Sequence, residues 1–480
     1  MQLLRYVGLF PLMAVALFAQ SADVLVRKAQ EDLRAGRNSQ AEIELSRAVE
    51  AEPANWNLWC DLGLARVQLE ESGLAIEAFE QARKLAPQEA PAYFGLGLVR
   101  MKKGDTDEAL EAYRLGLARD PDDPAANQNY ALLLMQKGDF RDAIEPLKRL
   151  KSLEQDKVST RATLIEAYLK TGMINQARGE IKQLLDTHLA TPQEELSIAK
   201  LLIGNGQSQA AEDVLKHAAA TWPETADPHG ELGLIFIARG LYESAVGELG
   251  RAAQLDPDSA KYALALGEAL LRWRHDPVAL QYLLAVQPRF GELALYKFEL
   301  GLAYFNLTRF PSALEQFEGL VREQPKSSRV HYLLGATYQE MGNLGKAEEC
   351  YRKAIALSPD EAGYYITLAS LLRRVNPRGL SEPVQLIQKG LALRPDDQEG
   401  KLLLASCFET QGKLAEAQAL LESLITSNPD SRAAHVALAK VYFREKKIED
   451  AQQQEAMAAK LETREQDRVS PWGPGQAGRP

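Results

Sequence analysis

The sequence predicts an all-α protein, a right-handed α-solenoid of about thirteen helix-turn-helix repeats. Prolines recur at 34 residues or multiples of 34, at Pro53, Pro87, Pro121, Pro223, Pro257, Pro325 and Pro359, and the period resumes after two extra residues at Pro395 and Pro429. With these prolines at position 32 of a 34-residue frame, position 20 is alanine in twelve of thirteen units. Position 8 is glycine or alanine in every unit except the one with Ile165. A period of this length is typical of stacked helix pairs.

Each unit contains two apolar stripes of helical spacing separated by a turn. Position 15, in the turn, is glycine in eight units, which predicts a left-handed residue after the first helix: Gly36, Gly104, Gly138, Gly172, Gly206, Gly240, Gly342 and Gly412. The proline at position 32 ends the second helix because it cannot continue one. The predicted repeats are 22–55, 56–89, 90–123, 124–157, 158–191, 192–225, 226–259, 260–293, 294–327, 328–361, 362–397, 398–431 and 432–465.

The small residues at positions 8 and 20 predict where the two helices of a unit cross. We expect Gly or Ala at position 8 to face the alanine at position 20, so that the backbones approach closely. A larger side chain would overpack this crossing. Gly97→Leu or Gly335→Leu is therefore expected to cost at least ~2 kcal/mol.

The first and last units are less apolar than the others. The first has Lys28 and Asp32 where leucine and an aromatic residue are usual, and the last has Glu455 at an apolar position. This is the composition expected of units that cap a stack, because their outer faces meet water.

The two chain ends lie outside the repeats. Residues 1–21 contain Arg5 and an apolar run of 13 residues, which is too short to span a bilayer as a helix and is typical of a secretory signal peptide. We expect an exported protein, periplasmic or associated with the envelope, without a transmembrane helix in the mature chain. An uncleaved N-terminal anchor is the alternative. Residues 466–480 end in a Pro/Gly-rich segment and are expected to be disordered.

Composition and charge argue against two further classes of protein, membrane bundles and nucleic-acid-binding proteins. Hydrophobic residues make up 46% of the chain and charged residues 25%, which suits a large soluble core and not a membrane bundle. The formal net charge is −10, so nothing draws the chain to a phosphate backbone, and nucleic acid is not expected as a partner.

Catalytic and metal-binding patterns are absent from the sequence. It has no G-x-x-x-x-G-K-[ST] loop, and no His/Cys cluster has metal spacing. Three histidines share position 4 with Trp59 and Tyr93 of other units and are interpreted as packing residues: His229, His331 and His435. The remaining histidines, His188, His217 and His275, fall in separate units, and Cys60, Cys350 and Cys407 are interpreted as small hydrophobic residues. We expect no enzymatic activity, no metal and no cofactor.

The repeat pattern resembles the tetratricopeptide repeat (TPR). Its sequence of an aromatic residue, Leu-Gly, a spaced alanine, a second aromatic residue and a closing proline is matched by Trp59, Leu62, Gly63, Ala75, Phe79, Ala82 and Pro87. The resemblance covers roughly residues 22–465. It implies a TPR superhelix that binds other proteins or peptides.

In this family the first helices line the inside of the superhelix, with positions 2, 5, 9 and 12 toward the ligand. Position 9 is not asparagine here and Asn129 stands alone at position 6, which argues against an asparagine ladder or a carboxylate clamp. Positions 5, 9 and 12 are mainly apolar, and the expected partner-binding groove consists of Leu64, Val67, Phe94, Leu98, Met101, Leu132, Met135, Leu234, Ile237, Phe298, Leu302 and Phe305. Such a groove suits an amphipathic helix or an extended apolar segment. The alternative is that these side chains pack against the adjacent first helix.

Two units depart from the pattern. Residues 260–293 lack the turn glycine and the closing proline, and residues 362–397 hold the two-residue insertion. Arg373, Arg374 and Arg378 surround this insertion and would suit an acidic partner, because irregular loops on a regular scaffold often carry function. Sequence drift without a functional consequence is the alternative.

The sequence therefore predicts a non-catalytic scaffold or adaptor that binds peptide or helical segments in its groove. One alternative is a solenoid that self-associates into a structural assembly of the cell envelope. Another is a chain that docks substrates for a separately encoded enzyme. The oligomeric state and the identity of the partner are left open.

Overall fold

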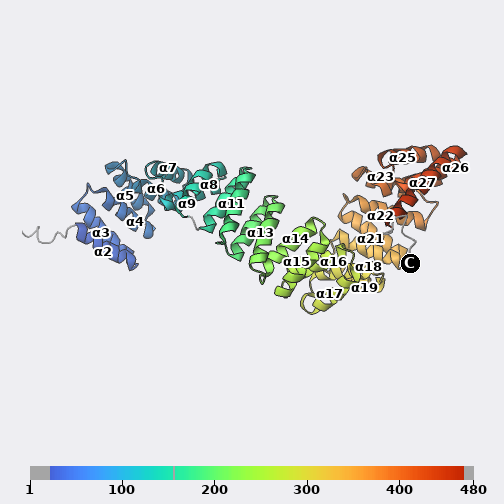
Figure 1. Cartoon of the computed structure of the whole chain (residues 1–480), viewed down its shortest axis with the longest axis horizontal. Coiled ribbons are helices and arrows are strands. Elements are labelled where there is room, and N and C mark those ends of the chain that lie inside the picture. Colours follow the sequence, from blue (N-terminus) through green and yellow to red (C-terminus); the bar gives the residue numbers. More distant parts are fainter. Residues whose placement is uncertain (1–21, 155–156, 470–480) are drawn as a thin grey trace, which may run out of the picture. The chain divides into compact units, whose positions relative to one another are not determined.

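The computed structural model describes residues 22–154 and 157–469, and within these ranges the chain is α-helical, without a β-strand. The predicted all-α fold is confirmed, and residues 22–154 and 157–469 form thirteen successive helix pairs. Figure 1 shows the order of these helices along the chain. Residues 1–21 and 470–480, on which the signal peptide and most of the disordered tail were predicted, lie outside the described residues. The chain divides into two compact units, residues 1–235 and 236–480, which we call unit 1 and unit 2.

Unit 1 contains six complete helix pairs. They are α2 (Ala22–Arg34) and α3 (Asn38–Ala51), α4 (Trp56–Gln68) and α5 (Ser72–Leu85), α6 (Pro91–Lys103) and α7 (Thr106–Leu117), α8 (Pro124–Lys137) and α9 (Phe140–Leu153), α10 (Val158–Lys170) and α11 (Ile174–Thr187), and α12 (Pro192–Gly204) and α13 (Ser208–Thr221). The boundary between the units lies inside α14 (Ala226–Ala238).

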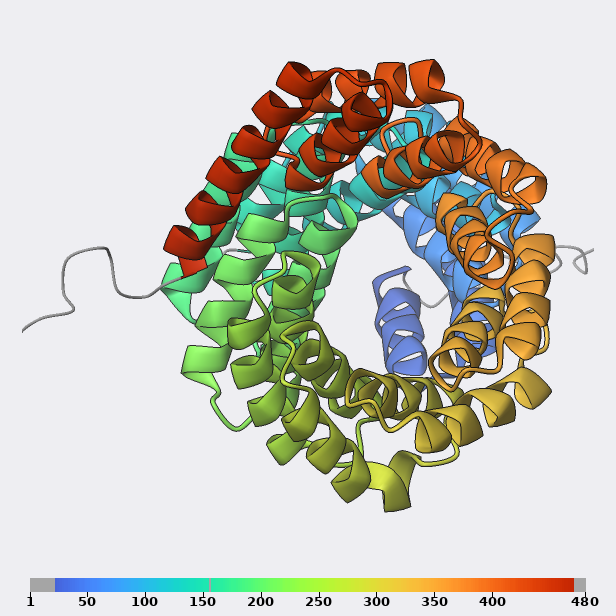
Figure 2. The ribbon, with the colours of Figure 1, turned by 90° about the vertical axis from the view of Figure 1, so that its right-hand side faces the viewer.

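Unit 2 continues with α15 (Tyr242–Leu255), and its helix pairs stack side by side (Figure 2). They are α16 (Ala260–Arg272) and α17 (Asp276–Phe290), α18 (Ala294–Asn306) and α19 (Phe310–Glu323), α20 (Ser328–Glu340) and α21 (Leu344–Leu357), α22 (Ala362–Val375) and α23 (Ser381–Leu393), α24 (Gln398–Thr410) and α25 (Leu414–Ser427), and α26 (Arg432–Arg444) and α27 (Ile448–Val469). Helix α27 extends beyond residue 465, where the disordered tail was predicted to begin, because no glycine or proline interrupts the sequence before Ser470.

In every repeat except 362–397, the turn between the two helices has a left-handed residue at position 15; in that repeat the position is taken by Asn376, with φ of −133°. All eight predicted turn glycines have positive φ, between 72° and 89°. Four units without glycine adopt the same conformation with other residues, namely Glu70, Arg274, Thr308 and Lys446, with φ between 58° and 62°. The repeat geometry thus imposes this backbone even where the side chain disfavours it.

The crossing of the two helices differs in one respect from the sequence-based expectation. The alanines at position 20 are fully buried, as Ala75 and Ala109 illustrate. The atoms nearest to a Cβ added at Gly97, however, belong to the ring of Tyr113 at position 24, at 2.9 Å, and not to Ala109. Gly335 lies against Tyr351 in the same way. At Gly97 and Gly335, glycine is therefore needed because an aromatic ring of the second helix covers the first helix at that point.

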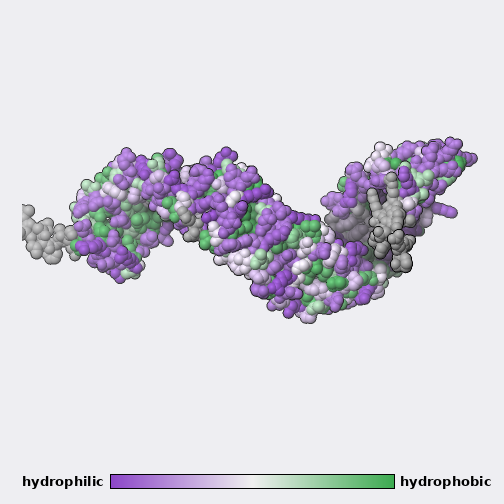
Figure 3. Space-filling model, viewed as in Figure 1, coloured by the Kyte–Doolittle hydropathy of each residue, from purple (hydrophilic) through white to green (hydrophobic). Residues whose placement is uncertain are grey.

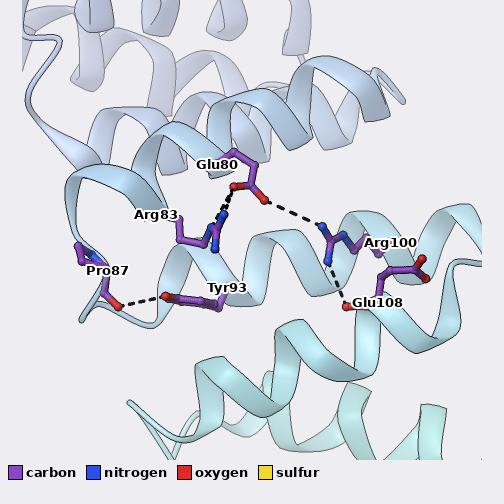
Figure 4. A network of polar contacts seen from close by, with 6 residues as sticks. All are labelled: Glu80, Arg83, Pro87, Tyr93, Arg100 and Glu108. Carbon is purple, nitrogen blue, oxygen red and sulfur yellow. Dashed lines mark hydrogen bonds and ion pairs between the residues drawn. The ribbon is translucent and has the colours of Figure 1, made fainter.

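Polar contacts link one repeat to the next in unit 1 (Figure 4). Glu80 of α5 accepts a hydrogen bond from Arg83, and its carboxylate lies 4.0 Å from the guanidinium of Arg100 in α6. Arg100 also donates to the carbonyl oxygen of Glu108 at the start of α7. These contacts are partly exposed, so they orient neighbouring helices more than they stabilise them.

The first repeat contains buried charges that are paired. Glu44 is buried and forms an ion pair with Lys28, and Asp32 is buried 2.7 Å from Arg37. At the other end of the repeats, Glu455 is exposed on α27. The polar residues noted in the two terminal units thus lie in paired or solvated environments.

Candidate functional site

The first helices α4, α6 and α8 of unit 1 border a pocket of about 410 Å³, which we call the unit 1 pocket. Three of the predicted groove residues line it, Leu64 from α4 and Phe94 and Leu98 from α6. These residues stand at positions 9, 5 and 9 of their repeats, and the stacking of successive first helices brings them together. Figure 3 shows hydrophobic residues interspersed with hydrophilic ones on this part of unit 1. The volume is within the range of about 300–1,000 Å³ typical of ligand pockets.

The position of Phe94 depends on a glycine in the neighbouring helix. A Cβ added at Gly116 of α7 would lie 2.4 Å from the Phe94 ring, so only glycine allows the ring to lie there. The half-buried ring packs against a core cluster that includes Tyr113 and Ala126, while it also lines the unit 1 pocket. Phe94 therefore has a structural role as well as a surface that a ligand can reach.

Polar groups also line the unit 1 pocket. Asp120 and Asp123 line it, together with Asn129 of α8. Asp123 caps α8, since its carboxylate accepts a hydrogen bond of 2.6 Å from the backbone N–H of Ala126. Asn129 donates to the hydroxyl of Tyr113 at 3.0 Å, and burial raises the pKa of Tyr113 to about 12, so this phenol is neutral. No lysine or arginine is among the residues that line the pocket.

The other predicted groove residues of unit 1 do not line this pocket. Leu132 is 47% exposed, and Met101 and Met135 are half-buried, with Met101 packed against the same cluster as Phe94. Val67 is buried in the core formed by α4, α5 and α6, so the prediction that it contacts a partner is wrong. Near the boundary of the units, Leu234 is half-buried, and the same prediction is wrong for Ile237, which is buried. At position 12, Val67 turns toward the helix pair and not toward solvent.

In unit 2 the predicted groove residues are mainly involved in packing. Phe298, Leu302 and Phe305 are half-buried against the core cluster around Phe317. The rings of Phe298 and Phe317 meet edge to face at 6.5 Å, and the guanidinium of Arg329 lies 4.6 Å from the centre of the Phe298 ring. The alternative of packing between adjacent helices thus describes these three residues better than an open groove does.

The insertion in repeat 362–397 borders a smaller pocket of about 330 Å³. Arg373 and Arg374 line it with Gln339, Ser370 and Thr410, whereas Arg378 is exposed and does not. Arg373 donates a hydrogen bond of 2.7 Å to the hydroxyl of Ser406.

The sequence interpretation missed a third pocket, of about 630 Å³, between α24 and α26. It is lined by Ser406, Glu409, Val436 and Lys440, which occupy positions 9, 12, 5 and 9 of their repeats. They correspond to the groove positions of the other units, but Ser406, Glu409 and Lys440 are polar, so the apolar pattern that predicted the groove did not include them.

The histidines at position 4 support the repeat structure. The imidazole Nε2 atoms of His331 and His435 lie 3.0 Å from the carbonyl oxygens of Pro325 and Pro429, respectively. The sequence did not indicate that His188 and His217 would stack, with ring centres 5.2 Å apart, or that His217 would lie 3.0 Å from the buried carboxylate of Glu195. Within residues 22–154 and 157–469, no group of three or more His, Cys, Asp or Glu side chains is arranged to hold a metal ion. No helix in those ranges is long and apolar enough to cross a membrane.

Cysteines contribute to the packing of both units. Cys60 and Cys407 are buried, Cys350 is half-buried, and all three are free thiols. Burial raises the pKa of Cys60 to about 12 and that of Cys350 to about 11, so both remain protonated at neutral pH.

The repeats match known protein families. Tetratricopeptide-repeat profiles match residues 26–90, 60–124, 100–161, 196–260, 328–361 and 410–462, which together make up more than half of the chain. The chain belongs to the tetratricopeptide-repeat family. It is thus a repeat scaffold of the class that binds other proteins.

Curated relatives are similar over limited regions. BBSome complex member BBS4 of Bos taurus is 24% identical over 37% of this chain and 34% of its own length. Protein O-mannosyl-transferase TMTC3 of Homo sapiens is 30% identical over 25% of this chain and 15% of its own length. Mitochondrial import receptor subunit TOM70 of Mus musculus is 24% identical over 54% of this chain and 37% of its own length. The chain spans between about one seventh and two fifths of these three relatives.

Solved structures with similar folds include Naa15/Naa10 bound to HypK-THB and yeast Tom70. The first has a TM-score of 0.44 and 13% identity, and the match covers 91% of this chain and 68% of that one. The second has a TM-score of 0.39 and 17% identity, and the match covers 94% of this chain and 97% of that one.

Proposed function

We propose that this chain is a non-catalytic adaptor that holds an apolar segment of another protein in the unit 1 pocket. The observation that carries the proposal is the convergence of Leu64, Phe94 and Leu98, from two successive first helices, on one pocket. Leu64 is 45% exposed, although it is a large hydrophobic residue in the middle of a helix. An apolar helix or extended segment would remove this surface from water, which favours binding by about 25 cal/mol per Å² buried.

Leu64 is the most suitable residue for testing the site, because it lines the pocket and is exposed. Replacing Phe94, Leu98 and Met101 together would damage the core, because Phe94 and Met101 pack against it. Leu64→Ser removes an exposed side chain from the pocket at little cost in stability. Leu74→Ser is the matched control, because Leu74 is 43% exposed on α5 and does not line the pocket.

A photoreactive amino acid placed at residue 64 or 74 of the full chain tests the proposal in the cells that make it. We expect residue 64 to label a discrete set of other proteins, and residue 74 not to label them. Equal labelling from both positions would contradict an adaptor site at this pocket. Labelling only of a second copy would favour the self-associating solenoid, which light scattering would also detect. Labelling of a transferase or protease would favour the enzyme-docking role.

Export is a second part of the proposal. The basic residue and short apolar run within residues 1–21 support a signal peptide and a periplasmic or envelope location. Fractionation of cells combined with N-terminal sequencing tests it. A cytoplasmic protein that retains Met1 would refute export.

A further inference from the structure

Two carboxylates face the unit 1 pocket without a basic partner. Asp120 and Asp123 line the pocket, and neither forms an ion pair with the residues that the structure describes. The neighbouring Asp122 differs, since its carboxylate lies 2.7 Å from Arg149. Asp107 is likewise paired, at 2.8 Å from Lys137. The two pocket carboxylates thus lack a cationic partner among the described residues. Asp120 is exposed to water, and Asp123 is stabilised by the N-terminus of α8, which it caps.

The hydrogen bonds of these carboxylates leave room for a ligand. One oxygen of Asp123 accepts from the backbone N–H of Ala126, and one oxygen of Asp120 accepts from the N–H of Asp122 at 3.2 Å. Each has a second oxygen that accepts no hydrogen bond from the described residues. A purely apolar ligand would take this negative charge out of water without pairing it, which is unfavourable. An acidic ligand would add repulsion.

The remaining lining is suited to an aliphatic chain. Leu64 and Leu98 present apolar surface next to the ring of Phe94. Lysine and arginine combine a long apolar stem with a cationic end group, so they can cover such a surface while the charge reaches a polar rim. The face of an aromatic ring also attracts a cation.

We infer that the unit 1 pocket recognises a lysine or arginine side chain carried by an apolar segment of the partner protein. The inference rests on the proposed function and specifies the chemistry of the partner. The aliphatic stem lies against Leu64 and Leu98, and the cationic group pairs with Asp120 and Asp123. A charge-assisted hydrogen bond of this kind gives directional selectivity in addition to the apolar contact.

Selection from a random 12-residue peptide library displayed on phage tests the inference on the full chain. Peptides whose binding is lost in Leu64→Ser should be enriched in lysine or arginine beside apolar residues. Exchanging the basic residue of a selected synthetic peptide for glutamine should weaken binding about tenfold, as expected for loss of a hydrogen-bonded charge pair.

Asp120→Asn/Asp123→Asn is the decisive variant. Asparagine at residue 123 preserves the helix cap, because Asn and Asp are equivalent in that position. In this variant the preference for the basic peptide should fall to about twofold or less. Asp107→Asn/Asp122→Asn is the matched control, because it also removes two carboxylate charges but outside the pocket, and it should retain the full preference.

The same selection distinguishes a wrong ligand chemistry from a wrong binding site. Two outcomes would overturn the inference and leave the adaptor function standing. One is the selection of apolar peptides that depend on Leu64 but show no preference for a basic residue. The other is a basic preference that survives in Asp120→Asn/Asp123→Asn. A selection that yields no peptide dependent on Leu64 would overturn both.

Discussion

The hydroxyl of Tyr93 donates a hydrogen bond to the carbonyl oxygen of Pro87, 3.1 Å away, across the turn between two repeats (Figure 4). The same spacing of six residues recurs between position 4 and the preceding proline. It joins Trp59 to Pro53, Asn127 to Pro121, His331 to Pro325, Tyr365 to Pro359 and His435 to Pro429. Side chains as different as indole, amide and imidazole therefore serve one purpose, which is to satisfy the carbonyl that follows the second helix.

Removing this hydrogen bond should lower stability without changing the fold. Tyr93→Phe is expected to cost about 1 kcal/mol, the usual contribution of one hydrogen bond. The cost stays modest because Arg119 also donates to the carbonyl of Pro87, at 2.8 Å. Urea unfolding of the parent and of Tyr93→Phe measures this loss of stability. Tyr130→Phe, at a half-buried tyrosine, is the control and should leave the midpoint unchanged.

Overpacking of a helix crossing should have a larger effect. Gly97→Leu places a side chain where the ring of Tyr113 lies, since even a Cβ would be 2.9 Å from that ring. We expect a loss of at least ~2 kcal/mol in thermal or urea unfolding. Gly179→Ala in α11 is the control, because nothing lies within 4 Å of its added Cβ, and it should stabilise by about 0.5–1 kcal/mol. A melting curve of Gly97→Leu that matches the parent would refute the assigned packing.

Replacing Thr308 by glycine should relieve backbone strain at the turn of its repeat. Thr308 has φ of 58°, a conformation that a β-branched residue disfavours. Thr308→Gly relieves the backbone strain but loses more conformational entropy on folding. Because the strain is the larger effect, we expect the variant to stabilise unit 2 by about 0.5–1 kcal/mol. The reverse change in the next repeat, Gly342→Thr, should destabilise, because Gly342 has φ of 79°. Stabilisation by both changes would show that backbone conformation does not control these turns.

Stability should fall with rising pH because of Glu299. This carboxyl is buried with one oxygen unpartnered among the described residues, and burial, with a smaller effect of Glu268, raises its pKa from 4.5 to about 9. Between these values the unfolded chain has released the proton and the folded chain still holds it, so stability decreases as pH increases through this window.

Glu299→Gln tests this pH dependence. The variant is expected to be more stable than the parent near pH 7, by at least about 1 kcal/mol, and its stability should vary less between pH 5 and 9. Urea unfolding at several pH values measures both effects. Glu292→Gln, at a fully exposed carboxylate, should change neither. Equal pH profiles for parent and Glu299→Gln would contradict the raised pKa.

The arginines of the insertion in repeat 362–397 remain a predicted site for an acidic partner. Arg374 lines the pocket of about 330 Å³ and is exposed, whereas Arg378 is exposed and does not line it. Arg374→Glu should weaken binding of a glutamate-rich peptide about tenfold, measured by fluorescence anisotropy, and Arg378→Glu should have a smaller effect. Absence of binding by the parent chain would remove this site.

The repeat positions explain which features could be predicted. The 34-residue period, the small residues at positions 8 and 20 and the glycine at position 15 depend on contacts within one helix pair. Each of these contacts joins residues that are close in the sequence, so the pattern by itself determined the helices, their turns and the family.

Contacts between repeats depended on the tertiary structure. The packing of α4 against α5 and α6 buries Val67 and leaves Leu64 exposed, and the stacking of repeats brings Asp120 and Asp123 to the pocket that Leu64 of an earlier repeat lines. Such meetings between residues distant in the sequence follow from how repeats stack, and periodicity alone does not specify them.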